Sequence, residues 1–326
     1  MVTMSNMQFS SAAVIGTGLM GPGIALTLAC RGLRCTLLSR SEEGAAQGLA
    51  RVKTQSQVLA AKGLIEPAAA ASAAARVTAS TDLDRTVAAV DLVVEAGPED
   101  MQWKQDLFAR MDAIAGADAV LASTTSGLSI TAIARGCKHA ERVITTHFWN
   151  PPHLMPLVEI VKGEHTSPAL VDSMRDFLAS CGKTPVVLRK DRPGQLGNRL
   201  QMALVREAAY IIAEGIADAD AVDTVVRDGL GIRLPAYGIL EHMDVVGLDL
   251  AISVAEYVAP DLYNEPHAPG YFHNLVRSGQ LGAKTGRGFY DWSAKSADEV
   301  CARRDAFLIE VLQYRRRGSD GSGQLK

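Results

Sequence analysis

The chain has 326 residues, of which 48% are hydrophobic and 21% charged; these values fit a globular protein with room for two domains and exclude a disordered or fibrous chain. Its 33 basic and 36 acidic residues give a net charge of −3, so no broad charge favours binding to nucleic acid or to a membrane surface. The five cysteines lack metal-ligand spacing, and no signal sequence or apolar spanning segment is recognised, so we expect a cytoplasmic protein with reduced thiols and no metal.

The segment SSAAVIGTGLMGPGIALTLACRG combines a strand-like apolar run, a glycine turn and a helical pattern. Gly16, Gly18 and Gly21 form G-x-G-x-x-G in the setting that this motif requires, between an expected strand and an expected helix. The first glycine allows the tight turn, the second lets a pyrophosphate approach, and the third lets helix and strand pack closely. Such a turn can also exist without a ligand, but its setting favours a dinucleotide site that includes Leu19 and Met20.

The second apolar run, in LRCTLLSRSEEG, ends where a dinucleotide fold usually has an acid for the adenosine ribose. Ser39 occupies this position and Arg40 follows it. Without the acid nothing repels a 2′-phosphate, which a hydroxyl and a guanidinium could bind. Alternatively, Arg40 only covers the adenine and the cofactor is NAD. The sequence leaves NAD and NADP open and favours NADP slightly.

The rest of the N-terminal half alternates helical and strand patterns. Residues 45–76, rich in alanine, are expected to form one or two surface helices broken at Gly63 and Pro67. Strands are predicted over residues 91–97, 118–124, 142–148 and 184–190, and helices over 99–115 and 129–136. This alternation predicts an α/β fold with a Rossmann-like, doubly wound and mostly parallel sheet in a domain spanning residues 1–190.

The stretch HFWNPPHLMPLVEIV, residues 147–161, contains a histidine at the end of one apolar run and a glutamate inside the next. Burial of Glu159 among aliphatic residues is costly without a partner. The prolines between the runs favour a chain reversal that could bring Glu159 beside His147, and the pair would then act as an oriented general base. Alternatively, Glu159 points to solvent from an edge strand and His147 merely ends a strand.

Beyond residue 197 the strand pattern disappears and long helical runs follow, one of them being GILEHMDVVGLDLAISVAEYV. We therefore expect an all-helical second domain over residues 191–326, with apolar faces that favour dimerisation. Residues 316–326, rich in glycine and serine, are expected to form a mobile tail, and residues 1–9 look similar.

Together these motifs resemble the 3-hydroxyacyl-CoA dehydrogenase family, which includes the related λ-crystallin/L-gulonate and carnitine dehydrogenases. The resemblance covers nearly the whole chain through AVIGTGLMGPGIA, VVEAGPEDMQWKQDLF, ASTTSGLSIT, HFWNPPHLMPLVEIV, DRPGQLGNRL and GAKTGRGFYDW. It implies NAD(P)-dependent oxidation of a secondary hydroxyl β to a carboxyl or thioester. It also implies a nucleotide domain followed by a helical domain for substrate closure and homodimer formation.

The resemblance implies catalytic roles for four residues. By motif, His147 matches the family's catalytic base and Glu159 the carboxylate that orients it. Ser126 and Asn198 match positions beside the reacting oxygen, where polar donors steady developing charge. In the implied reaction His147 accepts the hydroxyl proton while the carbon hydrogen leaves as hydride, and Glu159 stabilises the imidazolium.

The same matching implies further cofactor contacts. Asn150 resembles the family asparagine near the nicotinamide, while Glu99, Lys104 and Lys284 resemble cofactor-contacting positions. Each has a simpler alternative: Asn150, like Asn198, could cap a turn, Lys104 could be a solvated helix residue, and Lys284 could only end a loop.

Departures from the family pattern leave the substrate open. Thr124 and Gly127 occur where acyl-CoA enzymes usually read SNTSS, and Pro156 stands where CoA-using members often have lysine. The latter looks more like members that act on free hydroxy acids. A CoA substrate would favour basic residues on the helix after the second strand, where three are available: Arg51, Lys53 and Lys62.

Three functions therefore stay open. They are a dehydrogenase of 3-hydroxyacyl-CoA thioesters, a dehydrogenase of a free polar 3-hydroxy acid (carnitine- or gulonate-like), and a non-catalytic dinucleotide-binding protein like a crystallin. The intact set of four implied catalytic residues argues against the third.

Overall fold

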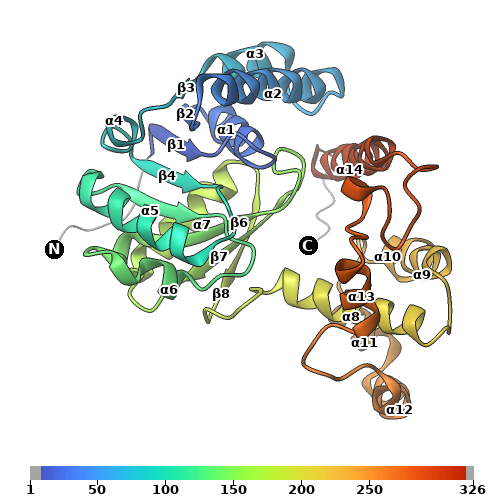
Figure 1. The fold of residues 1–326 in the computed structure, drawn as a ribbon. Coiled ribbons are helices and arrows are strands. Elements are labelled where there is room, and N and C mark those ends of the chain that lie inside the picture. The colour runs from blue at the N-terminus through green and yellow to red at the C-terminus, as the bar shows by residue number, and fades with distance from the viewer. Residues whose placement is uncertain (1–8, 321–326) are drawn as a thin grey trace. The chain divides into compact units, whose positions relative to one another are not determined.

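The computed structural model describes residues 9–320 and divides them into two compact units (Figure 1). The first comprises residues up to 198 together with those from 303 onward, and the second comprises residues 199–302. This differs from the expected division into residues 1–190 and 191–326. The first boundary lies slightly later, and the end of the chain belongs to the first unit rather than to the helical one.

The first unit is built on a single eight-stranded sheet. Its strands are β1 (Ser11–Ile15), β2 (Arg34–Leu38), β3 (Val77–Ser80), β4 (Leu92–Glu95), β5 (Val120–Ser123), β6 (Val143–Phe148), β7 (Leu157–Lys162) and β8 (Thr184–Leu188). They lie in the order β3-β2-β1-β4-β5-β6-β7-β8. Strands β1 to β6 are parallel, β7 runs antiparallel to β6, and β8 is parallel to β7. The predicted Rossmann-like, mostly parallel sheet is confirmed.

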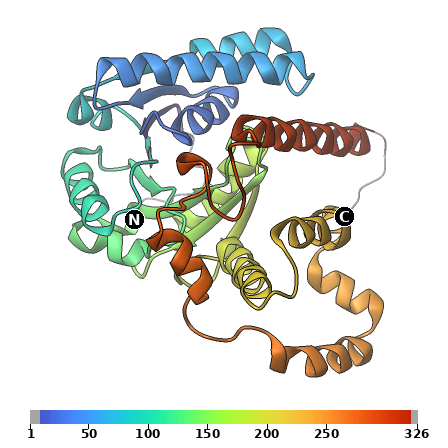
Figure 2. The same ribbon diagram turned by 45° about the vertical axis from the view of Figure 1, so that its right-hand side comes forward.

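Helices cover both faces of this sheet (Figures 1 and 2). They are α1 (Gly21–Cys30), α2 (Glu42–Ala61), α3 (Pro67–Ala75), α4 (Leu83–Val87), α5 (Met101–Ile114), α6 (Ile130–Ile133) and α7 (Pro168–Ser180), with the 3-10 turns η1 (Ala134–Gly136) and η2 (Ala140–Arg142). Because strand side chains alternate, Ala12 and Val14 of β1 pack with α1, α2 and α7, whereas Ala13 and Ile15 pack with α5 and α6. Both faces are therefore buried, as a parallel sheet requires.

The limits of α2 follow from local chemistry. Ser41 caps its N-terminus, since its side chain accepts a hydrogen bond from the N–H of Gly44. Gly63, with φ +65°, and Pro67 separate α2 from α3, as predicted. Strand β3 was not predicted, because VTAS is only four residues long and buries fully only Val77.

The last helix, α14 (Ala297–Asp320), returns to the first unit. Ile309 is 5% exposed and belongs to the same core cluster as α1, α2 and α7, and Gln313 Nε2 donates to the carbonyl of Lys62 at the end of α2 at 2.6 Å. The expectation of a mobile tail over residues 316–326 is wrong for residues 316–320, which are helical; residues 321–326 lie outside the described part. Of residues 1–9 only Phe9 is described, and it packs edge-on against Phe177.

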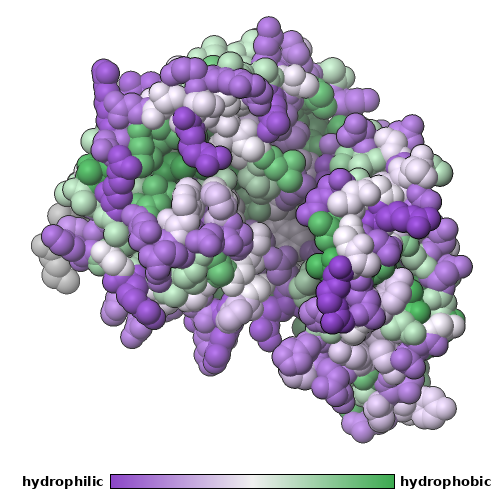
Figure 3. All heavy atoms as spheres, in the orientation of Figure 1, coloured by the Kyte–Doolittle hydropathy of each residue, from purple (hydrophilic) through white to green (hydrophobic). Residues whose placement is uncertain are grey.

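The second unit is helical, as predicted. It contains α8 (Gly197–Ala213, its first two residues in the first unit), α9 (Ala219–Val225), the π-helical turn η3 (Val226–Leu230), α10 (Gly231–Arg233), α11 (Ile239–Val246), α12 (Leu248–Val258), η4 (Ala259–Asp261), α13 (Gly270–Arg277) and η5 (Ala283–Thr285). The run over residues 238–258 is not one helix, because Gly247, with φ +100°, separates α11 from α12. Green, hydrophobic residues lie at the surface of this unit among purple, hydrophilic ones (Figure 3). Within the described residues no helix is long and apolar enough to cross a bilayer.

Candidate active site

His147 and Glu159 face each other across strands β6 and β7. The two residues are direct partners in the antiparallel register, and His147 Nδ1 lies 2.8 Å from Glu159 Oε2. His147 is 4% exposed and Glu159 1%. The proline-rich turn therefore reverses the chain as predicted, and the solvent-facing alternative for Glu159 is excluded. An ionised Glu159 keeps the proton on Nδ1 and leaves Nε2 as the acceptor.

Four donors converge on the Glu159 carboxylate. Oε2 accepts from His147 Nδ1 and from Trp149 Nε1, the latter at 3.1 Å, and Oε1 accepts from the backbone N–H groups of Leu196 and Gly197 at 3.0 and 2.9 Å. Burial alone would raise the pKa of Glu159, but these hydrogen bonds outweigh it and lower the pKa to about 2. The carboxylate is therefore held ionised. Trp149, Leu196 and Gly197 were not predicted; an indole two residues after a candidate base was the one available signal.

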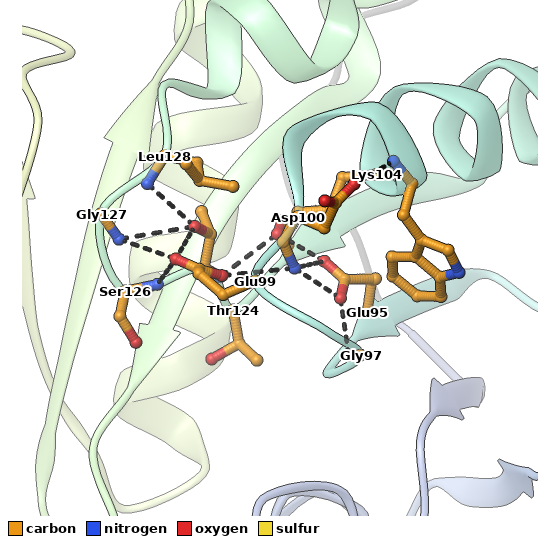
Figure 4. Close-up of polar contacts among 12 residues, drawn as sticks. Glu95, Gly97, Glu99, Asp100, Lys104, Thr124, Ser126, Gly127 and Leu128 are labelled. Carbon is orange, nitrogen blue, oxygen red and sulfur yellow. Dashed lines mark hydrogen bonds and ion pairs between the residues drawn. The ribbon is translucent and has the colours of Figure 1, made fainter. Parts of the chain in front are cut away.

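A second buried carboxylate, Glu95, ends strand β4 (Figure 4). It is completely buried, and both of its oxygens lie 2.7 Å from Lys104 Nζ on α5. Ser123 Oγ and the N–H of Gly97 also donate to it, each at 2.6 Å. Lys104 is only 1% exposed, which excludes the solvated-helix alternative. Its ammonium forms an ion pair with Glu95, so we infer that any effect of Lys104 on a cofactor is indirect.

Glu99 holds the loop that follows β5. Its Oε1 accepts from Thr125 Oγ1 at 2.6 Å and from the N–H groups of Ser126 and Gly127 at 2.9 and 3.1 Å (Figure 4). Glu99 Oε2 lies 3.6 Å from Lys104 Nζ. Lys104 therefore links the buried Glu95 to Glu99, and Glu99 in turn binds the loop that carries Ser126.

The structure brings Asn198 to the same loop. Asn198 Nδ2 donates to the backbone oxygen of Ser126 at 2.6 Å, and the preceding Gly197 donates to Glu159. Thr124 Oγ1 accepts from the N–H of Phe148, one residue after His147. Ser126, Asn198 and the His147 strand are thus joined by a short chain of hydrogen bonds.

The glycine turn has the geometry that a dinucleotide site needs. Gly16 has φ +113°, and a Cβ at Gly21 would lie 1.7 Å from the Gly16 oxygen, so both positions require glycine for folding. At Gly18 a Cβ would meet nothing within 4 Å, which leaves room for a pyrophosphate. Met20 gives α1 no side-chain cap, so first-turn N–H groups remain available for phosphates. Leu19 is 69% exposed beside this space.

No acid follows strand β2. Ser39 Oγ accepts from the N–H of Ser41 at 3.3 Å, and Arg40 is exposed. Arg51 on α2 donates through Nη1 to the carbonyl of Thr17 in the glycine turn at 3.0 Å. Arg51 thus supports the turn, a role that its interpretation as a possible CoA contact had not included.

The two remaining residues that were predicted to contact the cofactor, Asn150 and Lys284, are exposed. Asn150 is exposed in the turn after β6, where a cis peptide bond joins it to Pro151. Lys284 is exposed in η5 of the helical unit. Their contacts with a cofactor stay predictions.

Comparisons with known proteins agree with this geometry. Residues 11–192 match the model of the 3-hydroxyacyl-CoA dehydrogenase NAD binding domain, and residues 194–292 match that of the family's C-terminal domain. A 5-formyl-3-hydroxy-2-methylpyridine 4-carboxylate 5-dehydrogenase from Mesorhizobium japonicum is 32% identical over 299 residues, 92% of this chain and 96% of that protein. A probable 3-hydroxybutyryl-CoA dehydrogenase from Bacillus subtilis is 36% identical over 292 residues, 89% of this chain and 100% of that protein.

Solved structures give the same result. A 5-formyl-3-hydroxy-2-methylpyridine 4-carboxylic acid 5-dehydrogenase, described as an NAD+-dependent dismutase, has a TM-score of 0.86 at 30% identity and covers 97% of this chain and 100% of its own. An (S)-3-hydroxybutyryl-CoA dehydrogenase from Ralstonia eutropha has a TM-score of 0.72 at 32% identity and covers 87% of this chain and 99% of its own. The chain therefore belongs to the 3-hydroxyacyl-CoA dehydrogenase family, whose members are oxidoreductases that act on CH–OH groups.

Proposed function

We propose that this protein is an NAD-dependent dehydrogenase that interconverts an L-3-hydroxyacyl compound and its 3-keto form, with His147 as the proton acceptor. The observation that carries the proposal is the buried pair of His147 and Glu159, with Nδ1 and Oε2 2.8 Å apart at the C-terminal end of β6. Ligands of doubly wound sheets bind beyond these strand ends.

The protein's own groups supply proton transfer and alignment. Ionised Glu159 fixes the Nδ1 proton, so His147 Nε2 can take the proton of the substrate hydroxyl, and the carboxylate then stabilises the imidazolium. Ser126 and Asn198 would steady the charge that develops on the substrate oxygen. A bound nicotinamide supplies the hydride acceptor. In the reverse direction His147 returns the proton to the carbonyl oxygen.

The residues of the glycine turn fit a dinucleotide, and the matched domain model is an NAD binding domain. The absence of an acid at Ser39 and the exposed Arg40 support use of NADP as well. Steady-state rates with each cofactor test this: Arg40→Ala should lower kcat/KM for NADP about tenfold or more and change that for NAD little. A wild-type enzyme that discriminates strongly against NADP would contradict the proposed use of NADP and leave NAD as the cofactor.

A free carboxylic acid is the second candidate substrate, and Pro156 favours it, because CoA-using members often have lysine at this position. The matched C-terminal domain ends at residue 292, so α14 lies beyond it. Gln313 of α14 donates to the backbone carbonyl of Lys62, which places this helix beside the end of α2, although the Lys62 side chain stays exposed. We therefore treat α14 as a second element that could influence substrate choice.

A substrate panel separates the candidates. Absorbance of reduced nicotinamide is followed after mixing the protein and either cofactor with 3-hydroxybutyryl-CoA, free 3-hydroxybutyrate, carnitine, gulonate and a pyridine carboxylate with a hydroxymethyl group. The variant His147→Gln serves as the inactive control. Turnover of free acids alone would exclude the thioester, and turnover of the thioester alone would exclude the free acid. No turnover by a protein that still binds NAD in calorimetry would contradict the proposed activity and favour a non-catalytic protein.

We further propose that the helical unit forms a homodimer. Large apolar side chains are exposed on several of its helices: Leu200, Met202 and Leu204 on α8, Ile239, Leu240 and Val245 on α11, and Leu248, Leu250, Ile252 and Val254 on α12. Such a set exceeds scattered surface residues and favours a covered interface. Light scattering after size-exclusion chromatography should give twice the 34.6 kDa mass of one chain; a monomer at micromolar concentration would contradict this.

A further inference from the structure

Trp149 shares one oxygen of Glu159 with the catalytic base. Its Nε1 lies 3.1 Å from Oε2, and His147 Nδ1 lies 2.8 Å from the same atom. The two rings have centroids 5.6 Å apart and an interplanar angle of 48°. The indole is half-buried, whereas His147 and Glu159 are buried. Two N–H donors from neighbouring positions of one chain segment thus compete for the negative charge of one carboxylate oxygen.

We propose that Trp149 is a positioning residue that weakens the hold of Glu159 on the imidazolium and so sets the pH range in which His147 accepts the substrate proton. The inference rests on the proposed function. Each N–H that donates to a carboxylate disperses part of its charge, so a carboxylate with four donors stabilises a nearby cation less than one with three. Without the Trp149 donor, Glu159 would favour the imidazolium more strongly.

The indole also packs against the segment that binds the other oxygen of Glu159. A Cβ at Gly197 would lie 2.3 Å from Cζ2 of Trp149, so the ring occupies the space beside the Gly197 backbone. The Gly197 N–H itself donates to Oε1 at 2.9 Å. Trp149 therefore both donates to Oε2 and packs on the segment that donates to Oε1. Position 197 is restricted to glycine by the same packing.

The segment that leads to Leu196 and Gly197 carries the exposed Arg189, Lys190 and Arg192, together with Asp191, which accepts from Ser129 Oγ and the N–H of Thr131. Among the described residues, the ionisable side chain that contacts Glu159 is His147 alone. Strand β8, the other neighbour of β7, reads TPVVL and has no ionisable side chain. On the far side of β6, strand β5 ends at Ser123, whose hydroxyl donates to Glu95, and Glu95 is paired with Lys104. A change in pH dependence on altering Trp149 would therefore report on His147 and Glu159.

Trp149→Phe tests the inference, because it keeps a ring beside Gly197 and removes the N–H. The pH profile of kcat/KM is measured in the direction of hydroxyl oxidation, with the best substrate of the panel. The midpoint of the acid limb should move to higher pH by about half a unit, the effect of one hydrogen bond of ordinary strength. The rate on the alkaline plateau should change by less than about threefold. Trp292→Phe in the helical unit is the matched control and should leave the profile unchanged.

A second measurement does not depend on turnover. Histidine ring signals are followed by NMR as the pH is changed, and the signal of His147 is assigned by its absence in His147→Gln. The midpoint of this titration should move to higher pH in Trp149→Phe, as the acid limb does. If the wild-type enzyme has no dehydrogenase activity, the proposed function fails, while this titration still decides the role of Trp149. An unchanged titration and an unchanged acid limb in folded Trp149→Phe would overturn the inference and leave Trp149 as a packing residue.

Fluorinated tryptophan keeps the inference testable if Trp149→Phe does not fold. Uniform incorporation of 5-fluorotryptophan makes the indole N–H a stronger donor and preserves its shape. The acid limb should then move to lower pH, opposite to the direction expected for Trp149→Phe. Incorporation into Trp292→Phe should give the same shift, because that variant retains Trp149. No shift on fluorination would count against the hydrogen bond as the cause.

Discussion

Replacement of Glu159 by glutamine separates the charge of this residue from its shape. The glutamine oxygen can still accept from the N–H groups of Leu196 and Gly197, which lie 3.0 and 2.9 Å from Oε1. The side-chain NH2 then takes the place of Oε2, which accepts from His147 Nδ1 and Trp149 Nε1 in the native protein. Because one N–H cannot donate to another, the imidazole must make Nδ1 an acceptor and carry its proton on Nε2.

Glu159→Gln should lower both the catalytic rate and the stability of the fold. A protonated Nε2 cannot take the substrate proton, and the imidazolium loses its carboxylate, so kcat should fall about 10³-fold or more while KM changes little. The indole N–H of Trp149 loses its acceptor, which should lower the free energy of unfolding by about 1–3 kcal/mol. Glu164→Gln is the matched control, because Glu164 is exposed five residues further along the chain, and it should alter neither quantity.

Initial rates from nicotinamide absorbance and urea unfolding followed by circular dichroism measure the two losses. Glu159→Gln with more than about a tenth of wild-type kcat would refute the reasoning, since the dyad would then not govern proton transfer. A fall in kcat that merely parallels a loss of folded protein would also refute it. Glu159→Gln that is folded, binds NAD normally and turns over slowly is the expected result.

The remaining predictions concern stability and cofactor binding. The pKa of Glu159 is lowered from its ordinary 4.5 to about 2, so its ionised form stabilises the fold fully above about pH 5. About 3 kcal/mol of the free energy of unfolding should be lost as the pH falls towards 2. Urea unfolding across this range should show that the stability of Glu159→Gln depends less on pH than that of the native protein. Gly21→Ala should destabilise the protein by about 3 kcal/mol or more, because its Cβ would lie 1.7 Å from the Gly16 oxygen, whereas Gly18→Ala should fold normally and bind NAD more weakly in calorimetry. Lys104→Met should cost about 3–5 kcal/mol by leaving Glu95 buried without its cation, and the double variant with Glu95→Leu should recover most of that loss; equal instability of the two would contradict the ion-pair explanation.

Local sequence patterns were sufficient for most of the sheet and for the central pair of the site. The glycine turn predicted the first strand and helix, because only glycine tolerates the φ of +113° at position 16 and the close approach of the Gly16 oxygen to position 21. Two apolar runs joined by prolines indicated the reversal that makes His147 and Glu159 partners. In each case the decisive residues lie within about fifteen positions of one another, so that chain geometry limits the alternatives.

Contacts between distant segments were beyond such patterns. The donors from Leu196 and Gly197 to Glu159 come from 37 and 38 positions along the chain, and backbone N–H groups leave no mark in a sequence. Lys104 was expected to contact the cofactor, with a solvated helix residue as the alternative; its burial against Glu95 depends on how α5 docks over the end of β4, which the sequence does not show. Trp149 was visible, but its N–H acquires a meaning only when the position of Glu159 is known.

The predicted mobile tail was wrong for residues 316–320, and the physical reason also bears on substrate choice. The glycine- and serine-rich residues 316–326 indicated a mobile tail, whereas residues 316–320 continue α14. A helix that packs along one narrow face needs few apolar residues, so its last turns are hard to recognise in the sequence. Ile309 packs into the core, and Gln313 closes the end of α2 through the Lys62 carbonyl. The helix thus packs beside the end of α2, whereas the basic residues Arg51, Lys53 and Lys62 remain exposed. If removal of residues 303–326 left a folded protein that gained activity on 3-hydroxybutyryl-CoA, α14 would be the element that restricts this chain to smaller acids; unchanged selectivity would leave that choice to residues of the pocket such as Pro156.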